Sequence, residues 1–155
     1  MAAIKDRLKT DLVAALKAHD DARKSTVRMA LAAIANEEVA GKSARELSEA
    51  EEQSVLAREV SKRKDSAEAY TAGNRPELAG KELSEAVILS DYLPQQLSED
   101  EIAAIVGEEL DAATASLGEK PTIRQMGLVM KAVTQRIAGR GDGKTAAALV
   151  RAALA

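Results

Sequence analysis

Few residues in this sequence have side chains suited to catalysis. The single histidine, His19, stands beside Asp20 and Asp21 in a predicted turn between two helices. A His–Asp pair could join a distant serine in a triad, but no Gly-x-Ser-x-Gly segment is present to display that nucleophile. Adjacent side chains in a turn seldom share a designed hydrogen bond. We therefore interpret His19 as an exposed turn residue and expect no catalytic residue in this chain.

Carboxylate pairs are the next candidates for chemistry, and they do not converge. Adjacent acids occur at Glu37-Glu38, Glu51-Glu52 and Glu108-Glu109. Neighbouring residues on a helix point about 100° apart, so the two carboxylates of a pair do not converge on one site. No Glu-x-x-His motif offers a di-metal site, and the absence of cysteine removes thiolate ligands and disulfides. We expect no metal site and no cofactor.

One glycine-rich segment could contact phosphate: Gly139-Arg140-Gly141-Asp142-Gly143-Lys144. It lacks the spacing of a Walker loop and no strand precedes it. In the plain interpretation, Gly139 ends one helix, Gly141 makes the turn and Asp142 caps the next helix. In the functional alternative, the glycines let a phosphate backbone approach, flanked by Arg140 and Lys144. Asp142 argues against an anion lying directly on that helix N-terminus.

Positive charge is concentrated near the C-terminal end. The formal net charge is −3, yet the segment from Lys120 to Arg151 holds seven bases and one acid, Asp142. Such a segment is either a footprint for a polyanion or a solvated basic helix face, and the residues alone leave both open. The candidate nucleic-acid-binding residues are Arg124, Lys131, Arg136, Arg140, Gly141, Lys144 and Arg151.

A second basic run lies near the middle of the chain. Arg58, Lys62 and Arg63 form a candidate secondary basic surface. The alternative is a solvated helix face that pairs with itself, since Glu59 stands four residues before Arg63. With no Phe or Trp, the chain offers little for stacking on unpaired bases, so any RNA would be recognised by its shape.

The elements that position these residues are predicted to be all helical. Ala, Leu, Val, Ile and Met must build the core, and helix formers dominate among them. Apolar spacing and caps predict helices at about 3–17, 22–39, 49–72, 76–92, 99–117, 122–138 and 143–154, with Leu83, Val87 and Ile88 as core candidates of the fourth. Capping boxes at Ser48 and Ser98 and cap candidates at Asn74 and Asp142 mark four of the helix starts.

Two domains are expected, 1–95 with about four helices and 98–155 as a three-helix tail, separated by the short polar segment Pro94-Gln95-Gln96-Leu97. The tail, of about 58 residues, is near the lower size limit for independent folding, because domains of about 60 residues bury only about 60% of their unfolded surface. The N-terminal residues include no apolar run of the kind that predicts a secretory signal. No stretch is long and apolar enough to cross a membrane. We therefore expect a cytoplasmic protein.

Several segments of the chain match a known family. The chain resembles the stand-alone YqeY proteins, relatives of the C-terminal tail region of GatB, a component of the aspartyl/glutamyl-tRNA amidotransferase. The matching segments are Arg28–Glu37, Arg58–Ser66, Tyr92-Leu93-Pro94-Gln95-Gln96-Leu97-Ser98 and Met126-Gly127-x-Val129-Met130 through Gly143. The resemblance covers essentially the whole chain. One departure is Gly141, where the family is expected to have Ala.

The resemblance implies a helical N-terminal domain, a small tail domain and contact with tRNA. It also implies, by inheritance from the larger enzyme, a carbon–nitrogen ligase activity with glutamine as amido donor. No residue here could carry ammonia transfer or ATP, so we expect no such catalysis. Two hypotheses remain: a module that binds tRNA or structured RNA, and a protein-interaction adaptor that docks on an amidotransferase or translation factor.

Overall fold

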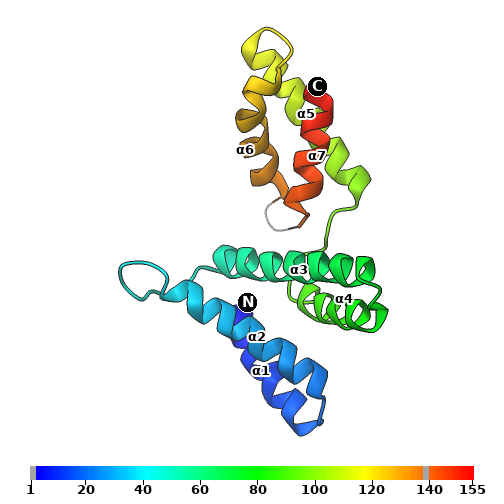
Figure 1. Cartoon of the computed structure of the whole chain (residues 1–155). Helices are drawn as coiled ribbons and strands as arrows, with labels where there is room; N and C mark the ends of the chain where they lie inside the picture. Colours follow the sequence, from blue (N-terminus) through cyan, green and yellow to red (C-terminus); the bar gives the residue numbers. More distant parts are fainter. Residues whose placement is uncertain (1–2, 138–139) are drawn as a thin grey trace. The chain divides into compact units, whose positions relative to one another are not determined.

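A computed structural model describes residues 3–137 and 140–155, and within these ranges the chain is helical without any strand (Figure 1). This confirms the predicted all-α fold. The elements are α1 (Ile4–Lys17), α2 (Asp21–Glu38), α3 (Glu49–Ala72), α4 (Pro76–Ser90), α5 (Glu99–Leu117), the 3-10 turn η1 (Ile123–Gln125), α6 (Met126–Ile137) and α7 (Gly143–Leu154).

The chain divides into two compact units. Unit 1 is Met1–Pro94 and unit 2 is Gln95–Ala155. Each unit has its own cluster of buried apolar side chains. The candidate nucleic-acid-binding residues from Arg124 to Arg151 all belong to unit 2, whereas Arg58, Lys62 and Arg63 belong to unit 1.

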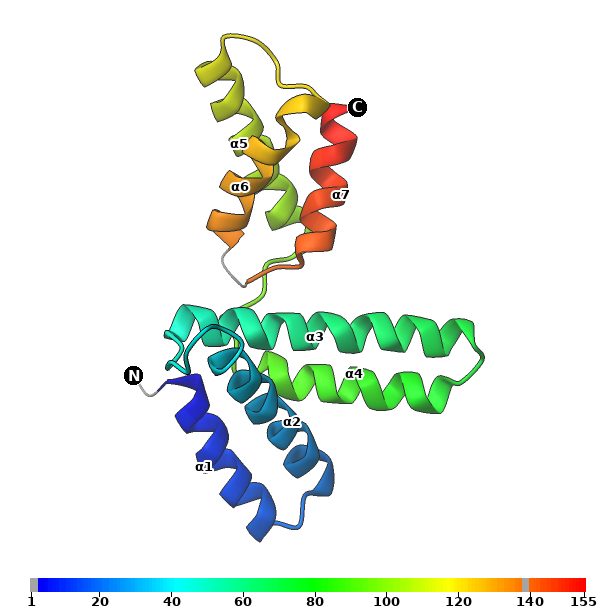
Figure 2. The same ribbon diagram turned by 60° about the vertical axis from the view of Figure 1, so that its left-hand side comes forward.

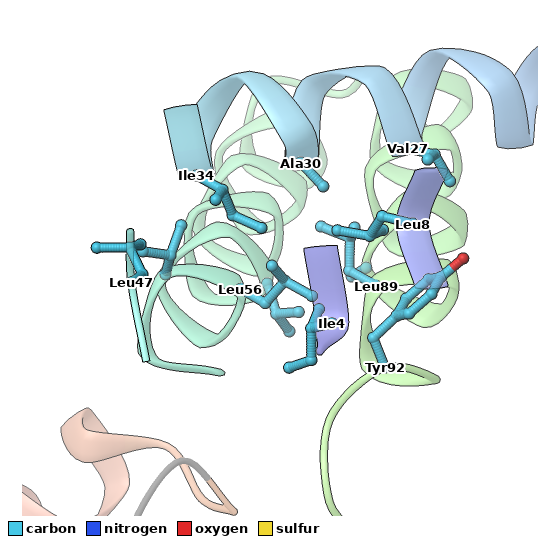
Figure 3. Close-up of a cluster of buried hydrophobic side chains, with 12 residues drawn as sticks. Ile4, Leu8, Val27, Ala30, Ile34, Leu47, Leu56, Leu89 and Tyr92 are labelled. Atoms are coloured by element: carbon cyan, nitrogen blue, oxygen red, sulfur yellow. The ribbon is translucent and has the colours of Figure 1, made fainter. Parts of the chain in front are cut away.

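Unit 1 consists of two helical hairpins that share one core. Figure 2 shows α1 beside α2 and the long helix α3 beside α4. Figure 3 shows how α1, α2, α3 and α4 each send aliphatic side chains into the same interior. Tyr92 closes this core from the segment after α4. The buried apolar residues of the core are Ile4, Leu8, Val27, Ala30, Ile34, Leu47, Val55, Leu56, Val60, Ala86, Leu89 and Tyr92.

Local cap signals set several helix starts. Asp20 accepts a hydrogen bond from the backbone N–H of Arg23 at the start of α2. Ser48 and Ser98 each form the reciprocal capping box with the glutamate three residues later, which confirms both predicted starts. Asp142 caps α7 by accepting from the N–H of Lys144, also as predicted.

The N-terminus of α1 is capped by a different helix. Its N-cap residue, Ala3, has no side chain that accepts a hydrogen bond. Instead the buried carboxylate of Glu52, on α3, accepts from the backbone N–H of Lys5 at 3.1 Å. The Lys5 ammonium then pairs with Glu38 of α2 at 2.6 Å. A carboxylate near an N-terminus is favoured by the helix dipole, so this contact ties three helices of unit 1 together.

Unit 2 is a bundle of α5, α6 and α7, in which each helix contacts the other two (Figure 1). Gly118 ends α5 in the left-handed region, with φ of +76°, a conformation that glycine adopts without strain. The buried core consists of Ile102, Ile105, Val106, Ala113, Val129, Val133, Ile137, Ala146, Val150 and Leu154. This core fixes which sides of α6 and α7 remain exposed, and with them the cations of both helices.

Three details of the predicted helices are wrong. Leu83 and Val87, expected in the core, are 49% and 64% exposed, and α4 buries Ala79, Ala86 and Leu89 instead. The small alanines allow α4 to lie close against α3. Arg75 rather than Asn74 is the N-cap of α4, because Asn74 adopts a positive φ in the preceding turn. The spacing of Ile123 from Met126 and Met130 predicts that it shares their apolar stripe, but Ile123 is 53% exposed because it begins the 3-10 turn before α6.

Candidate nucleic-acid interface

The two C-terminal helices contain basic but no acidic residues. α6 carries Lys131 and Arg136, and α7 carries Lys144 and Arg151. Lys144 and Arg151 are seven residues apart, two helical turns, so they lie on one face of α7. Both are exposed, as are Ala148 and Ala152 on the same side of the helix. We call these four residues the α7 basic face. Its alanines present little bulk beside the cations.

Arg136 is neutralised within the bundle. Its guanidinium lies 2.6 Å from a carboxylate oxygen of Glu108 and 3.2 Å from one of Glu109, both on α5. Hydrogen bonds with Glu108 and Glu109 raise the pKa of Arg136 above its ordinary value. A phosphate would have to displace these two carboxylates, so Arg136 is a weak candidate for binding an anion.

Arg140 is half-buried and holds the segment before α7 in place. Its Nη2 donates to the backbone carbonyl of Arg136 at 3.0 Å. Its own carbonyl accepts from the backbone N–H of Leu97 at 2.6 Å, which joins the start of unit 2 to this turn. These contacts give Arg140 a structural role whether or not it also contacts an anion.

Gly141 serves packing rather than access for a phosphate. A Cβ at this position would lie 2.9 Å from Cγ2 of Ile137 and 3.1 Å from Cδ1 of Ile102, both core residues. The open side of the glycine therefore faces the core of unit 2. Gly139, predicted to end α6, lies outside the described residues.

The N-terminus of α7 already has an anionic partner. Oδ1 of Asp142 accepts from the backbone N–H of Lys144 at 3.0 Å, and Oδ2 accepts from the hydroxyl of Thr145 at 3.2 Å. The carboxylate thus occupies the position that a bound phosphate would need. The plain interpretation of this glycine-rich segment, a turn followed by a capped helix, accounts for its residues.

Arg124 and Lys131 remain as exposed cations on η1 and α6. Within residues 3–137 and 140–155, neither forms an ion pair with a carboxylate. They differ from the α7 basic face in having exposed aliphatic neighbours, Ile123 and Leu128, which are 53% and 55% exposed. Charge is therefore presented by two surfaces of unit 2 with different chemistry.

The predicted secondary basic surface is wrong for Arg63. This residue is buried, and its guanidinium donates to Glu59 at 3.0 Å and to Glu85 of α4 at 3.3 Å. Arg58 and Lys62 are exposed, but they pair with Glu37 at 2.9 Å and Glu59 at 2.9 Å. The self-paired alternative describes the contacts of Glu59 with Lys62 and Arg63, and the spacing of Glu59 and Arg63 was its signal. It does not describe Arg58, which pairs with α2, or the burial of Arg63 and its contact with α4.

Sequence reasoning did not anticipate the roles of Glu108 and Glu109 on α5. Their pairing with Arg136 crosses 27 residues to a neighbouring helix, beyond any local pattern. A helical-wheel comparison of α5 and α6 offers only one indication: α5 is acidic where α6 is basic. In the described part of the chain, no group of three or more metal-ligating side chains comes together. None of the helices described is both long and apolar enough to span a membrane.

Fold and site together define an all-helical protein of two units, the second of which concentrates its cations on its last two helices. Comparison with known protein families identifies the family of this chain. The chain belongs to the Yqey-like protein family, whose pattern matches residues 5–154.

The curated relatives share a name that refers to mitochondria. The "Altered inheritance of mitochondria protein 41, mitochondrial" of Saccharomyces cerevisiae is 40% identical over 117 residues, covering 73% of this chain and 62% of that protein. The protein of the same name from Lachancea thermotolerans is 36% identical over 124 residues, covering 77% of this chain and 66% of its own length. The chain thus spans less than two thirds of the Saccharomyces relative's length.

The expected cytoplasmic location is contradicted by these relatives, which are named as mitochondrial. The sequence argument tested only for an apolar segment. Mitochondrial targeting segments are amphipathic, rich in Arg and Ser and poor in acids, so hydropathy does not detect them.

Proposed function

We propose that this protein binds structured RNA, tRNA being the leading candidate, through phosphate contacts made by unit 2 and without catalysis of its own. The observation that carries the proposal is the α7 basic face: Lys144 and Arg151 are exposed on a helix that has no acidic residue. The one acid between Lys120 and Arg151, Asp142, is engaged as a helix cap. Positive charge therefore dominates the side of α7 that faces solvent.

The absence of aromatic side chains from the α7 basic face indicates the kind of RNA that it would bind. It has no aromatic side chain on which an unpaired base could stack. Recognition would therefore rest on the spacing of phosphates along a folded backbone, as in proteins that read the shape of double-stranded RNA. The family relation to the tail of a tRNA amidotransferase supports tRNA among structured RNAs.

Salt-dependent titration of tRNA tests the proposal. If about four phosphates are contacted, log K falls against log salt with a slope of about −3 to −4. Replacing Lys144 and Arg151 together by Gln is expected to reduce that slope by about 2, one for each lost phosphate contact. A flat salt response in the parent protein, or an unchanged slope in the double variant, would refute phosphate binding by the α7 basic face.

Arg136 supplies the matched control. It is exposed and basic, it lies on α6 outside the α7 basic face, and Glu108 and Glu109 already neutralise it. Arg136→Gln removes one positive charge from the same unit and should leave the salt slope unchanged. If the slope changes in Arg136→Gln by half as much as in the double variant, which removes two charges, net charge alone rather than a specific face governs binding.

A second candidate function is an adaptor that docks on an amidotransferase or translation complex. The observation in its favour is the pair of exposed apolar side chains on α4, Leu83 and Val87. A pull-down with the parent protein and with a Leu83→Ser, Val87→Ser variant tests it. A protein partner that survives nuclease treatment and is lost with the variant supports the adaptor; partners that vanish with RNA digestion support RNA binding.

A further inference from the structure

Two glycines on the surface of unit 2 have no structural explanation within the unit. Gly107 lies in the middle of α5 and Gly127 in the first turn of α6, and both are exposed. A Cβ added at either position would meet nothing within 4 Å. Glycine inside a helix costs stability relative to alanine. Since neither position needs glycine for packing or for a turn, both are suited to close approach by another molecule.

The surroundings of Gly127 are basic and apolar. Lys131 follows it by four residues and so lies on the same side of α6, and Arg124 precedes it by three residues in the 3-10 turn η1. Beside them Ile123 and Leu128 are 53% and 55% exposed. We call these five residues the α6 face. Its aliphatic side chains would gain little from a phosphate backbone, whereas they would be buried by a protein surface.

The surroundings of Gly107 include an exposed acid, Asp111, and a base, Lys120. Asp111 follows Gly107 by four residues on the same side of α5, is exposed, and forms no ion pair within the described residues. Gly107 and Asp111 line a shallow depression of about 450 Å³ whose other walls include Leu110, Pro121 and Ala153. Lys120 also lines it, so an approaching cation is expected on the Asp111 side. We call Gly107, Asp111 and this depression the α5 face.

We propose that the α6 face of one copy of this protein docks on the α5 face of a second copy. The two faces are complementary in three respects. The cations Arg124 and Lys131 meet Asp111, an exposed Leu128 has an apolar depression to enter, and both helices carry a bare glycine where their backbones would cross. Small residues at a crossing point let two helices approach closely.

The contact joins two different surfaces, so it is heterologous. It therefore forms either a closed ring or a growing chain of copies rather than a two-fold pair that uses one patch twice. One helix against one helix and a depression is a small interface, of the size found in transient complexes. Self-association is expected at micromolar concentrations and should weaken with added salt, because its ion pairs are exposed.

Charge reversal with mixing tests the proposal on the full chain. Sedimentation is measured on nuclease-treated protein at rising concentration, for the parent, for Lys131→Glu and for Asp111→Lys. Each single variant should associate about tenfold more weakly, because it places like charges opposite one another. An equimolar mixture of the two should regain association, since every contact between unlike copies again pairs opposite charges.

Three further measurements make the outcome specific. Gly127→Ala should raise the midpoint temperature of unfolding and yet weaken association, a combination that a folding defect cannot produce. Lys81→Glu on α4, with the same charge change in unit 1, should associate like the parent. A Lys144→Gln, Arg151→Gln variant should also associate normally, which separates this proposal from RNA binding.

The proposal is overturned if the parent is monomeric throughout the micromolar range at low salt, or associates only when RNA is present. It is equally overturned if the mixture of Lys131→Glu and Asp111→Lys remains as weakly associated as each variant alone.

Discussion

Glu51 performs two tasks at the N-terminus of α3. Its carboxylate accepts from the backbone N–H of Ser48 at 2.8 Å, and it pairs in a bidentate manner with the Arg45 guanidinium at 2.6 and 3.0 Å. The hydrogen bonds from Arg45, followed by those from Ser48, lower the pKa of Glu51 from its ordinary 4.5 to about 2. Glu101 has a lowered pKa for a related reason, the backbone hydrogen bond from Ser98.

These lowered values predict how stability depends on pH. A carboxylate whose pKa is depressed by folding contributes stability above its unfolded pKa and loses it as the pH falls through the folded value. For Glu51 that loss spans pH 4.5 down to about 2. Glu51→Gln keeps an acceptor for the cap but removes the charge. We expect the variant to lose less stability on acidification, measured by urea unfolding at a series of pH values in this window.

Glu68 provides the comparison for that experiment. It is an exposed glutamate within the same helix, and Glu68→Gln removes the same charge. If the acid dependence of Glu68→Gln changes as much as that of Glu51→Gln, the effect reflects the total charge of the chain and not the capping box.

Four of the caps were predictable from sequence because each is a contact between residues two or three positions apart, unlike the cap that Glu52 supplies to α1. Ser48, Ser98, Asp20 and Asp142 all accept from backbone amides within three residues. Gly141 was not, because the atoms that require a glycine there belong partly to Ile102, far away in sequence. Whether a cation is free or paired is equally non-local, as the contact of Arg136 with α5 shows.

At the scale of elements, Arg63 links three helices of unit 1. It lies on α3, it donates to Glu85 on α4, and its Nη2 lies 3.8 Å from the sulfur of Met29 on α2. Burial raises the pKa of Glu59, but hydrogen bonds from Lys62 and Arg63 outweigh it, so the pKa is lowered overall. Removing the arginine would leave Glu59 and Glu85 without their shared buried cation.

Arg63→Ala is therefore expected to destabilise unit 1 by about 3 kcal/mol, in the range seen when one partner of a buried ion pair is removed. Chemical unfolding followed by circular dichroism measures the change. Arg58→Ala is the control: its pair with Glu37 has the same chemistry, but both side chains are substantially exposed, so the loss should stay below about 1 kcal/mol. Equal losses would contradict the assignment of Arg63 as a core contact.

Which side of a helix faces the core is harder to predict than where the helix lies. In α4 the larger residues Leu83 and Val87 suggested one face, yet the small Ala79 and Ala86 lie against the core. Side-chain size favours burial in general, but close packing of two long helices favours small residues at the contact. The periodicity of α4 satisfies either choice, and only the neighbouring α3 decides between them.

At the scale of the whole molecule, charge is separated within unit 2. The acids of this unit are concentrated on α5, whereas α6 and α7 have only bases. Some of this separation is used internally, by Arg136 with Glu108 and Glu109. The other charges of these helices are exposed to solvent. The RNA-binding proposal and the self-association proposal both rest on these exposed charges. The total charge of −3 conceals this pattern entirely.

The core of unit 1 extends beyond the end of α4. Tyr92 is buried in the core of unit 1; its hydroxyl donates to Asp11, and the Arg7 guanidinium lies 5.2 Å from the centre of its ring. Burial, together with the hydrogen bond to Asp11, raises the pKa of this tyrosine. The residues just after α4 therefore complete the first core instead of serving only as a tether.

A fragment ending at Pro94 should thus fold cooperatively, whereas one ending at Ser90 should be less stable by about 3 kcal/mol, comparable to the loss of a large buried aromatic side chain. The complementary fragment 95–155 has its own core and should be helical alone, although its small size makes it the less stable half. Urea unfolding of the three fragments measures this. Equal stability of the two N-terminal fragments would show that Tyr92 contributes little to unit 1. If fragment 95–155 is unfolded, the core of unit 2 is not sufficient to keep that fragment folded.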